Sequence, residues 1–380
     1  MNIRLSEELK MLKEMAYKFA VAEFTPHIRE CDEHEKYTPE IRKKAAQNGL
    51  VGAWIPDTYG GAGAGILGNA VITEELSKID MGIGLNVVAA CFGCESIFQY
   101  GSEEQKKTWL PPVCAGDWVS AGAFTEPNAG TDVAGYKTRA VRQGDQYVIN
   151  GNKMFITNGT VCNFMVAQCI TNPDQKKHNS FSLIIVPADA PGVTRNKIRG
   201  KMGIRSSDTA EIAFEDVKVP VANLVGKEGK GFYELMHFFD TTRVMVSAQG
   251  LGLSEACLET SVKYCKERTA FGAPLGSYQL TQKKLAEMAI MIEALRGLVY
   301  QSAALIDEGT PDYTLAAMAK FYSGQTAVFC ANCAVELHGG YGYIDEYACQ
   351  KWYRDAKILE LYEGTKEAEI MTIGRFLQTK

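Results

Sequence analysis

A short break near the end of the chain carries a carboxylate that could act as a general base. Leu359–Glu367 reads Leu-Glu-Leu-Tyr-Glu-Gly-Thr-Lys-Glu and lies between two segments of helical periodicity. Gly364 can adopt backbone angles that other residues rarely take, and Thr365 can cap the helix that follows. A partly desolvated carboxylate at Glu363 would have a raised pKa and could accept a proton. The alternative is a solvated glutamate at a helix end.

Length and composition indicate a soluble globular protein with more than one domain. The chain has 380 residues, of which 46% are apolar and 22% are charged, and this predicts two or three domains. Its 40 basic residues are scattered and its net charge is −5, so no nucleic-acid partner is expected. No apolar run is as long as the roughly 18 residues of a membrane span, so no membrane insertion is expected.

The cysteines and histidines predict no metal site. Eleven cysteines, without a signal-peptide pattern at the start of the chain, indicate free thiols in a reducing cytoplasm. Two Cys-x-x-Cys pairs, Cys91/Cys94 and Cys330/Cys333, fit either half of a zinc or dithiol site or buried small side chains. We favour buried side chains, because both pairs lie in apolar, Ala-rich sequence and the five histidines form no ligand-spaced pair.

Periodicity divides the chain into helical, β and helical parts. It predicts an α+β multidomain protein with an N-terminal α-helical domain (1–120), a central antiparallel β-barrel-like domain (121–228) and a C-terminal four-helix bundle (229–380). The expected helices are Leu5–Phe24, Pro39–Asn48, Asn69–Lys78, Leu85–Tyr100, Glu103–Val113, Phe232–Thr269, Gln279–Glu308, Leu315–His338 and one after Thr365. Ser6, with Leu9 and Leu12 after it, suggests a capped start of the first helix. The expected strands are Gln146–Ile149, Lys153–Thr157, Phe164–Ile170, Ser182–Val186, Glu211–Phe214 and Val217–Val219. Asn150-Gly151 predicts a hairpin between the first two strands.

Gly63-x-Gly65-x-x-Gly68 matches a dinucleotide-binding fingerprint in form only. That fingerprint requires a preceding strand, a following helix and strand, and an acidic residue about twenty positions later. Here the flanking segments look helical and no acid stands at that distance. A Rossmann site is therefore the minor alternative.

Three glycine-containing segments could surround a polar ligand. Phe124–Asp132 combines hydroxyls, small residues and backbone donors that could wrap a ring edge or a phosphate, and an ordinary turn explains it equally well. Phe155–Gly159 offers an aromatic ring and a hydroxyl for a flat cofactor. His338–Gly342 follows a helix and lets the backbone approach a ligand closely.

Two charged groups in the helical part also admit two interpretations. Arg268, near a helix C-terminus, could reach a pyrophosphate or interact with the helix dipole alone. Asp240 and Arg243 share a helix face, so they could form an ion pair or bind a polar ligand.

The order of these segments resembles the acyl-CoA dehydrogenase family over essentially the whole chain. The matching blocks are Phe124–Asp132, Phe155–Asn158, Lys201–Gly203, Arg268–Gly272, Gly339-Gly340 and Tyr362–Thr365. The resemblance implies FAD bound between the β domain and the bundle, a homotetramer, and an acyl-CoA substrate. It implies that a carboxylate removes the α-proton, that the β-hydrogen leaves as hydride to the flavin, and that electron-transfer flavoprotein receives the electrons.

The resemblance also implies residue roles. Glu363 matches the catalytic base. FAD contacts are implied for Phe124, Thr125, Gly130, Thr131, Phe155, Ile156, Thr157, Arg268, Phe271, Gln279, Glu336, Gly339, Gly340, Thr365 and Glu367, with Arg268 and Phe271 reaching the FAD of a neighbouring subunit. Substrate contacts are implied for Thr131, Asp240, Arg243, Cys91, Tyr362 and Gly364.

Departures from the family pattern reduce the range of acyl groups that the substrate is expected to carry. Glu336 stands where many members have Gln, which alters the adenine-side contact. Thr242 occupies the place where the isovaleryl-type branch carries its base, which supports Glu363 as the base. Residues 79–105 contain no Arg or Lys, so a dicarboxylate tail is not expected. The overall look is closest to the short-chain, butyryl-type branch. A branched or cyclic acyl group, including a cyclohexane- or cyclohexene-carboxyl-CoA, stays open, as does an enoyl-CoA reductase or acyl-CoA oxidase of the same fold.

Overall fold

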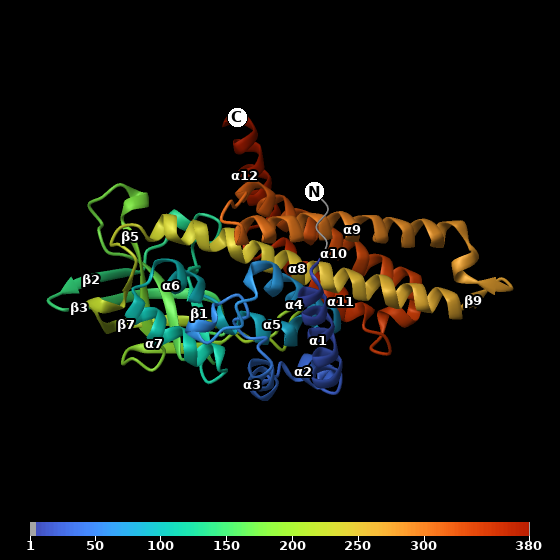
Figure 1. The fold of residues 1–380 in the computed structure, drawn as a ribbon, viewed down its shortest axis with the longest axis horizontal. Helices are drawn as coiled ribbons and strands as arrows, with labels where there is room; N and C mark the ends of the chain where they lie inside the picture. Colours follow the sequence, from blue (N-terminus) through green and yellow to red (C-terminus); the bar gives the residue numbers. More distant parts are fainter. Residues whose placement is uncertain (1–4, 380) are drawn as a thin grey trace.

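The computed structural model describes residues 5–379 and follows a helical, β, helical order. Figure 1 shows the sheet at one end of an elongated molecule, with the long C-terminal helices running to the other end. The N-terminal helices are α1 (Glu7–Phe24), α2 (Ile28–His34), α3 (Pro39–Gln47), α4 (Gly65–Ile79), α5 (Met81–Val88), α6 (Cys94–Tyr100) and α7 (Glu103–Cys114). Ser6 caps α1 by accepting from Leu9 N, as its sequence predicts.

The β domain is a mixed eight-stranded sheet, which corrects the expected antiparallel barrel. Its strands run in the order β6-β7-β3-β2-β4-β5-β8, and β1 pairs with β4 in parallel. Among the described residues the edge strands β6 and β8 do not pair with each other, so the sheet stays open. The strands are β1 (Ser120–Ala123), β2 (Arg139–Gln143), β3 (Gln146–Thr157), β4 (Phe164–Ile170), β5 (Phe181–Pro187), β6 (Val193–Lys197), β7 (Thr209–Pro220) and β8 (Leu224–Val225).

The C-terminal part is helical, as the sequence predicts. Helix α8 alone spans 37 residues and runs from the sheet to the far end of the molecule, where the short β9–β10 ribbon lies (Figure 1). The elements are α8 (Gly231–Glu267), β9 (Thr269–Ala270), β10 (Ala273–Pro274), α9 (Gln279–Asp307), α10 (Tyr313–His338), α11 (Cys349–Ala356) and α12 (Lys366–Thr379). Helices α2 and α11 were not predicted.

One core joins both helical parts to a face of the sheet. Phe164 and Val166 of β4 pack into the large helical core, whereas Met165 and Ala167 belong to a second core on the other face. Alternating residues therefore point to opposite faces, and both faces of β4 are buried. The helices and the sheet are fixed relative to each other by this shared apolar contact.

The predicted Asn150-Gly151 hairpin is wrong. Both residues lie inside β3, at a register shift between Ile149 and Gly151. The Asn150 side chain exchanges two hydrogen bonds with Asp216 of β7, and a Cβ on Gly151 would lie within 3 Å of Thr138. The chain turns earlier, at Gly144, because there the positive φ of +65° closes the β2–β3 hairpin.

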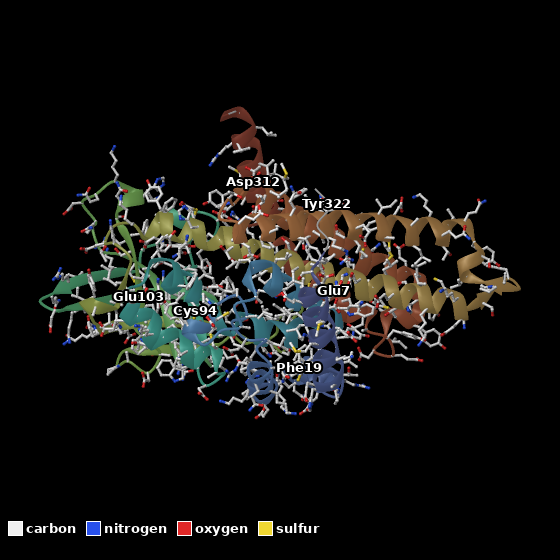
Figure 2. The ribbon with its side chains drawn as sticks, in the orientation of Figure 1. Glu7, Phe19, Cys94, Glu103, Asp312 and Tyr322 are labelled. Atoms are coloured by element: carbon white, nitrogen blue, oxygen red, sulfur yellow. The ribbon has the colours of Figure 1, made fainter. Side chains whose placement is uncertain are left out.

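The predicted helix Leu85–Tyr100 is divided in two. Helix α5 ends at Val88 and α6 begins at Cys94, with Gly93 between them at a φ of +102°. A Cβ on Gly93 would lie 3.0 Å from Ala121 O, so the break lets β1 approach the chain closely. Figure 2 labels Cys94 at the start of α6, among the tightly packed side chains beside the sheet.

The Gly63–Gly68 stretch is a helix start and not a dinucleotide loop. Helix α4 begins at Gly65, and the strands described here all come later in the chain. Asp307 of α9 accepts hydrogen bonds from Ile66 N (2.7 Å) and Leu67 N (2.9 Å). An internal carboxylate therefore occupies the place at the helix end where a phosphate would bind, and the Rossmann alternative is wrong.

Two stretches are long and apolar enough, by length and composition, to cross a membrane. They are Met81–Tyr100, of which 89% is buried inside the protein, and Gln279–Asp307, of which 33% is buried. The first comprises the divided helices α5 and α6, and core helices of globular proteins pass the same test. The second leaves Leu280 and Ile290 exposed on its outer face. The expectation of no membrane insertion stays a prediction.

Candidate active site

Glu363 lies in a tight break between η8 (Lys357–Glu360) and α12. Both Glu363 (φ +54°) and Gly364 (φ +103°) have left-handed backbone angles. Such angles are uncommon for a glutamate, and they turn its side chain back toward the bundle. Thr365 accepts from Ala368 N at 3.2 Å and so caps α12, which confirms the predicted local geometry.

The Glu363 carboxylate has one hydrogen-bond partner among the described residues. Thr242, buried on α8, donates its hydroxyl to Glu363 Oε2. Burial raises the pKa of Glu363 above its ordinary value, and the Thr242 hydrogen bond and the charges of Arg243 and Lys320 oppose this only in part. The result is a partly buried carboxylate that holds a proton more readily than a solvated one.

The carboxylate faces the junction of the bundle, the sheet loops and the N-terminal helices. Its negative charge contributes to raising the pKa of Glu95 on α6 and of Tyr136 in the loop before β2, after the larger effect of their own burial. Glu95 is buried, and its pKa is raised to about 8. Tyr136 donates to Gly130 O at 3.3 Å and so connects this junction to the Phe124–Asp132 loop.

The loop after β1 is held rigidly at one end and is open at the other. Phe124 is buried against Phe238, with ring centroids 5.1 Å apart. Lys153, fully buried in β3, donates to Phe124 O and to Glu126 at 3.0 Å each. Gly130 and Thr131 are exposed, and a Cβ on Gly130 would meet no atom within 4 Å. The loop can therefore present backbone donors without moving its base, and partly buried Thr125 lies between the two ends.

Phe155, Ile156 and Thr157 end strand β3 with side chains in different surroundings. The Phe155 ring is 66% exposed on a backbone with a φ of +59°. Such an exposed ring is suited to stacking on a planar group. Ile156 points into the second core, so that only its backbone could contact a ligand. Thr157 is partly exposed.

The predicted substrate residues of α8 are bonded to each other. Arg243 Nη1 lies 3.0 Å from Asp240 Oδ1, and Arg243 Nε lies 3.1 Å from Glu369 Oε1 of α12. Burial raises the pKa of Asp240 to about 6. The ion-pair interpretation is confirmed, and their contact with a substrate stays a prediction. Cys91 is buried with its thiol directed to Val88 O, and its place in an acyl pocket also stays a prediction.

A second group of predicted ligand residues gathers at the other end of the molecule. Arg268, Glu336, Gly339 and Gly340 line an open hollow of about 480 Å³. A Cβ on either glycine would meet no atom within 4 Å, and the buried Nε2 of His338 has no hydrogen-bond partner within residues 5–379. A guanidinium, open backbone and an unpaired ring nitrogen suit a phosphate- and ribose-bearing ligand. The residues therefore fit the dinucleotide part of FAD.

Phe271 and Gln279 extend this second group outward. The Phe271 ring is 100% exposed at the tip of the β9–β10 ribbon, and Gln279 begins α9 on the surface. In Figure 1 this ribbon lies at the opposite end from β2 and β3. One chain therefore does not bring the Phe155 and Arg268 groups together. Glu336 pairs with Lys284, so its carboxylate already has a partner. Glu367 is exposed on the first turn of α12, beside the partly buried Thr365.

Two residues of the Glu363 surroundings were missed by the sequence reasoning. Lys320 of α10 is 1% exposed and donates to the carbonyl oxygen of Gly364. Glu369 of α12 is 0% exposed and pairs with Arg243. A lysine directly after the Ala-rich stretch Ala316–Ala319 was the available signal, because an isolated charge in a buried helix requires a partner.

Comparisons with known proteins match all three parts of the chain. The family descriptions "Acyl-CoA dehydrogenase, N-terminal domain", "middle domain" and "C-terminal domain" match residues 6–117, 121–217 and 229–378. An acryloyl-CoA reductase (NADH) of Anaerotignum propionicum is 41% identical, over 99% of this chain and 95% of that protein. A cyclohex-1-ene-1-carbonyl-CoA dehydrogenase of Geobacter metallireducens is 37% identical, over 98% of each chain.

A solved structure extends the agreement to the whole fold. The butyryl-CoA dehydrogenase of Megasphaera elsdenii superposes with a TM-score of 0.96 at 38% identity, and the match covers 100% of both chains. All three parts of the chain are therefore matched in sequence, and the complete chain is matched in structure. The protein belongs to the acyl-CoA dehydrogenase family, whose members are FAD-dependent oxidoreductases.

Proposed function

We propose that this protein removes hydrogen from the α and β carbons of an acyl-CoA thioester to give the 2-enoyl-CoA. The observation that carries the proposal is the partly buried Glu363 carboxylate, which has a raised pKa and only the Thr242 hydroxyl as a hydrogen-bond partner in the described part of the chain. Such a carboxylate can take the α-proton, which is acidic only when the thioester carbonyl is polarised. FAD, when bound, accepts the β-hydrogen as hydride. Charge and atoms balance, since the substrate loses one proton and one hydride.

The surrounding residues support this reaction by orienting its parts. Thr242 directs the carboxylate, and the left-handed backbone at Glu363 and Gly364 fixes the loop that carries it. The Phe155 ring and the Thr125–Thr131 backbone would hold the flavin end of FAD. Tyr362 and Gly364 flank the base and would lie beside the substrate. The aromatic rings of Phe92, Phe124 and Phe238 contact one another nearby and help exclude water.

The acyl group that we propose is short, branched or alicyclic. Similarity to butyryl-CoA and cyclohexene-carbonyl-CoA dehydrogenases supports both the straight and the cyclic alternatives. The 41% identity to an acryloyl-CoA reductase gives a second candidate function, the same reaction run toward the saturated thioester. Activity with an enoyl-CoA and a reduced electron donor would distinguish this reductase. Rapid reoxidation of the reduced enzyme by oxygen alone would indicate an oxidase.

We further propose that the protein works as a homotetramer in the cytoplasm with electron-transfer flavoprotein as its acceptor. Phe155 lies at the end of β3 in the sheet, whereas Arg268 follows α8 next to the β9–β10 ribbon, at the end of the molecule away from the sheet, so we infer that a complete FAD site needs a second copy. The exposed ribbon tip at Phe271 and the exposed apolar residues Leu280 and Ile290 of α9 are suited to that contact. Sedimentation of the FAD-loaded protein tests the assembly.

The test of the function is Glu363→Gln. Wild-type protein should be yellow and should bleach when acyl-CoA is added without oxygen. The variant should keep FAD and bind acyl-CoA, while kcat falls about 10³-fold, because the amide cannot accept the proton. Glu104→Gln, on the exposed start of α7, is the matched control and should keep its rate. A variant that retains a large share of kcat contradicts the base assignment, and a colourless wild type that takes up no FAD contradicts the function.

A further inference from the structure

The loop that carries Glu363 rests on a buried lysine. The Lys320 side chain comes from α10, is 1% exposed and donates to the carbonyl oxygen of Gly364, the residue directly after Glu363. One turn later on the same helix, a Cβ on Gly324 would lie 3.0 Å from Leu359 O, so α10 packs directly against η8. Burying an ammonium group costs free energy unless the group is paired or hydrogen-bonded. Here the hydrogen bond to Gly364 offsets part of that cost and holds the loop.

A buried glutamate supports the same loop from α12. Glu369 is 0% exposed, and its Oε1 lies 3.1 Å from Arg243 Nε. A Cβ on Gly364 would lie only 1.9 Å from the same Oε1. The carboxylate therefore fills the space directly against Gly364. A side chain at residue 364 would therefore displace the Glu369 carboxylate, and the φ of +103° favours glycine independently.

We propose that Lys320 and Glu369 are positioning residues that hold the Glu363 carboxylate in place and set its affinity for protons with opposite charges. The proposal rests on the proposed function, since it assigns Glu363 as the base. Neither residue touches the reacting atoms. Lys320 fixes the loop by its bond to Gly364 O, and Glu369 fixes the other side while it neutralises Arg243. Arg243 is in turn held by Asp240.

The electrostatic effects of the two residues on Glu363 have opposite signs. The Lys320 charge lowers the pKa of Glu363, and the Glu369 charge raises it. Burial lowers the pKa of Lys320 itself to about 8, against the opposing charges of Glu369, Glu363 and Glu360 and with the support of Arg243. These are the charged groups that face Lys320 from η8, α8, α12 and the loop.

The experiment compares the acid limb of the kcat/KM profile in two variants of the FAD-loaded enzyme. In Lys320→Met a cation is lost beside the base, so the acid limb should move to higher pH. In Glu369→Gln an anion is lost, so it should move to lower pH. The ratio of kcat/KM on the limb to kcat/KM on the plateau should change about threefold or more, in opposite directions. Lys320→Arg keeps the cation and should keep the wild-type acid limb. Lys357→Met removes an exposed cation, which pairs with Glu360, and is the matched control.

A merely structural role would lower FAD content and rate in both variants and leave the two limbs unmoved or moved together, which would overturn the proposal. A second measurement is the thermal melt of the FAD-loaded protein. Because the folded pKa of Lys320 is below its ordinary 10.5, the unfolded chain binds more protons between about pH 8 and 10.5. The melting temperature of wild type relative to Lys320→Met should therefore rise over this range. A constant difference also overturns the proposal, and wild type without turnover rejects the proposed function instead.

Discussion

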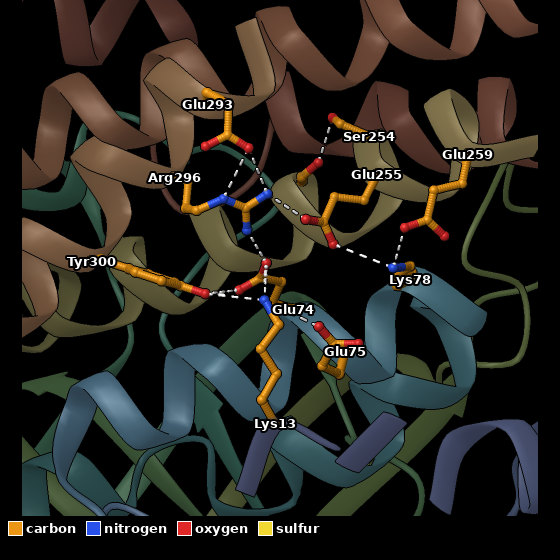
Figure 3. A network of polar contacts seen from close by, with 11 residues as sticks. Lys13, Glu74, Glu75, Lys78, Ser254, Glu255, Glu259, Glu293, Arg296 and Tyr300 are labelled. Atoms are coloured by element: carbon orange, nitrogen blue, oxygen red, sulfur yellow. Dashed lines mark hydrogen bonds and ion pairs between the residues drawn. The ribbon is translucent and has the colours of Figure 1, made fainter. Parts of the chain in front are cut away.

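Two buried groups of charged residues in this protein differ in how many direct partners their central carboxylate has. Figure 3 shows the first, where α1, α4, α8 and α9 meet. Glu74 is 0% exposed there and is bonded to Lys13, Arg296 and Tyr300, so that both carboxylate oxygens have partners. In the second group, Glu363 has one hydrogen-bond partner among the described residues, the Thr242 hydroxyl. Its nearest cations are bonded elsewhere, Arg243 to Asp240 and Lys320 to Gly364 O.

The first group illustrates how buried carboxylates are paired with cations and held in place. Carboxylate oxygens of Glu74, Glu75 and Glu255 come within 4.8 Å of one another, a spacing that could hold a metal ion. Lys13, Lys78 and Arg296 supply the positive charge at this place, with Lys13 3.2 Å from Glu75 and Lys78 3.8 Å from Glu255. The side chains of the chain itself therefore balance the acidic cluster.

The difference in direct partners indicates which of the two carboxylates can accept a proton from a substrate. A carboxylate with several direct partners is a poor proton acceptor, because protonation would break its hydrogen bonds. Lys320 binds the backbone of Gly364, next to Glu363, and not the Glu363 carboxylate itself. The loop is therefore held in place, while among the described residues the carboxylate accepts a hydrogen bond only from Thr242. If the two groups act independently, changes in the first should alter the free energy of unfolding, and changes in the second should alter the reaction rate.

The largest effect is expected from breaking the first group at its centre. Arg296→Met removes the cation that joins Glu74 and Glu255 and leaves three carboxylates with only Lys13 and Lys78, among the described residues, to balance them. The free energy of unfolding should fall by about 3 kcal/mol. Denaturant melts would measure the loss, and the rate per FAD-loaded molecule should stay at the wild-type value. Arg29→Met breaks an exposed pair with Glu33 and should leave the free energy of unfolding almost unchanged, because solvent screens this pair. A fall in kcat with unchanged stability would show that the groups are coupled.

The sequence predicted features whose causes are local. The Ser6 cap, the strand Phe164–Ile170 and the break at Gly364 depend on neighbouring residues, and each is present. Wrong or missing predictions depend on distant partners. Asn150-Gly151 has a strong turn signal, but Asp216, 66 residues away, holds Asn150 in a strand. Long-range pairing outweighs such a local preference.

The same reasoning explains what was missed around the base. The type and place of Glu363 followed from the glycine break and the family resemblance. Lys320 is separated from its partner Gly364 by 44 residues, and its helix carries no pattern that identifies the contact. The separation of the ligand residues into two groups could not be predicted either, since it depends on how the sheet that carries Phe155 is placed relative to the end of α8, where Arg268 lies.

A smaller effect is expected from Thr242→Val, which keeps the side-chain shape and removes the hydroxyl. The Thr242 hydrogen bond lowers the pKa of Glu363, so its loss should raise that pKa and move the acid limb of kcat/KM to higher pH. At a pH on this limb, kcat/KM should fall about tenfold, because a hydrogen bond to a charged group contributes about 1.5 kcal/mol. The plateau rate should change less. The free energy of unfolding should fall only slightly. An acid limb at the wild-type pH would mean that Thr242 does not hold the reacting carboxylate.

The smallest effect is expected from Tyr300→Phe in the first group. Tyr300 is buried and donates its hydroxyl to Glu74 Oε2 at 2.5 Å, while Lys13 approaches the same hydroxyl at 3.2 Å. The ring stays packed in the variant, and Lys13 and Arg296 still neutralise Glu74, so unfolding should become easier by only about 1 kcal/mol. The matched comparison is the Arg296→Met,Tyr300→Phe double variant. Because both residues bond the same carboxylate, their effects should not add. Additive losses would mean that Glu74 does not link them, and a shifted acid limb in Tyr300→Phe would mean that the first group reaches the base after all.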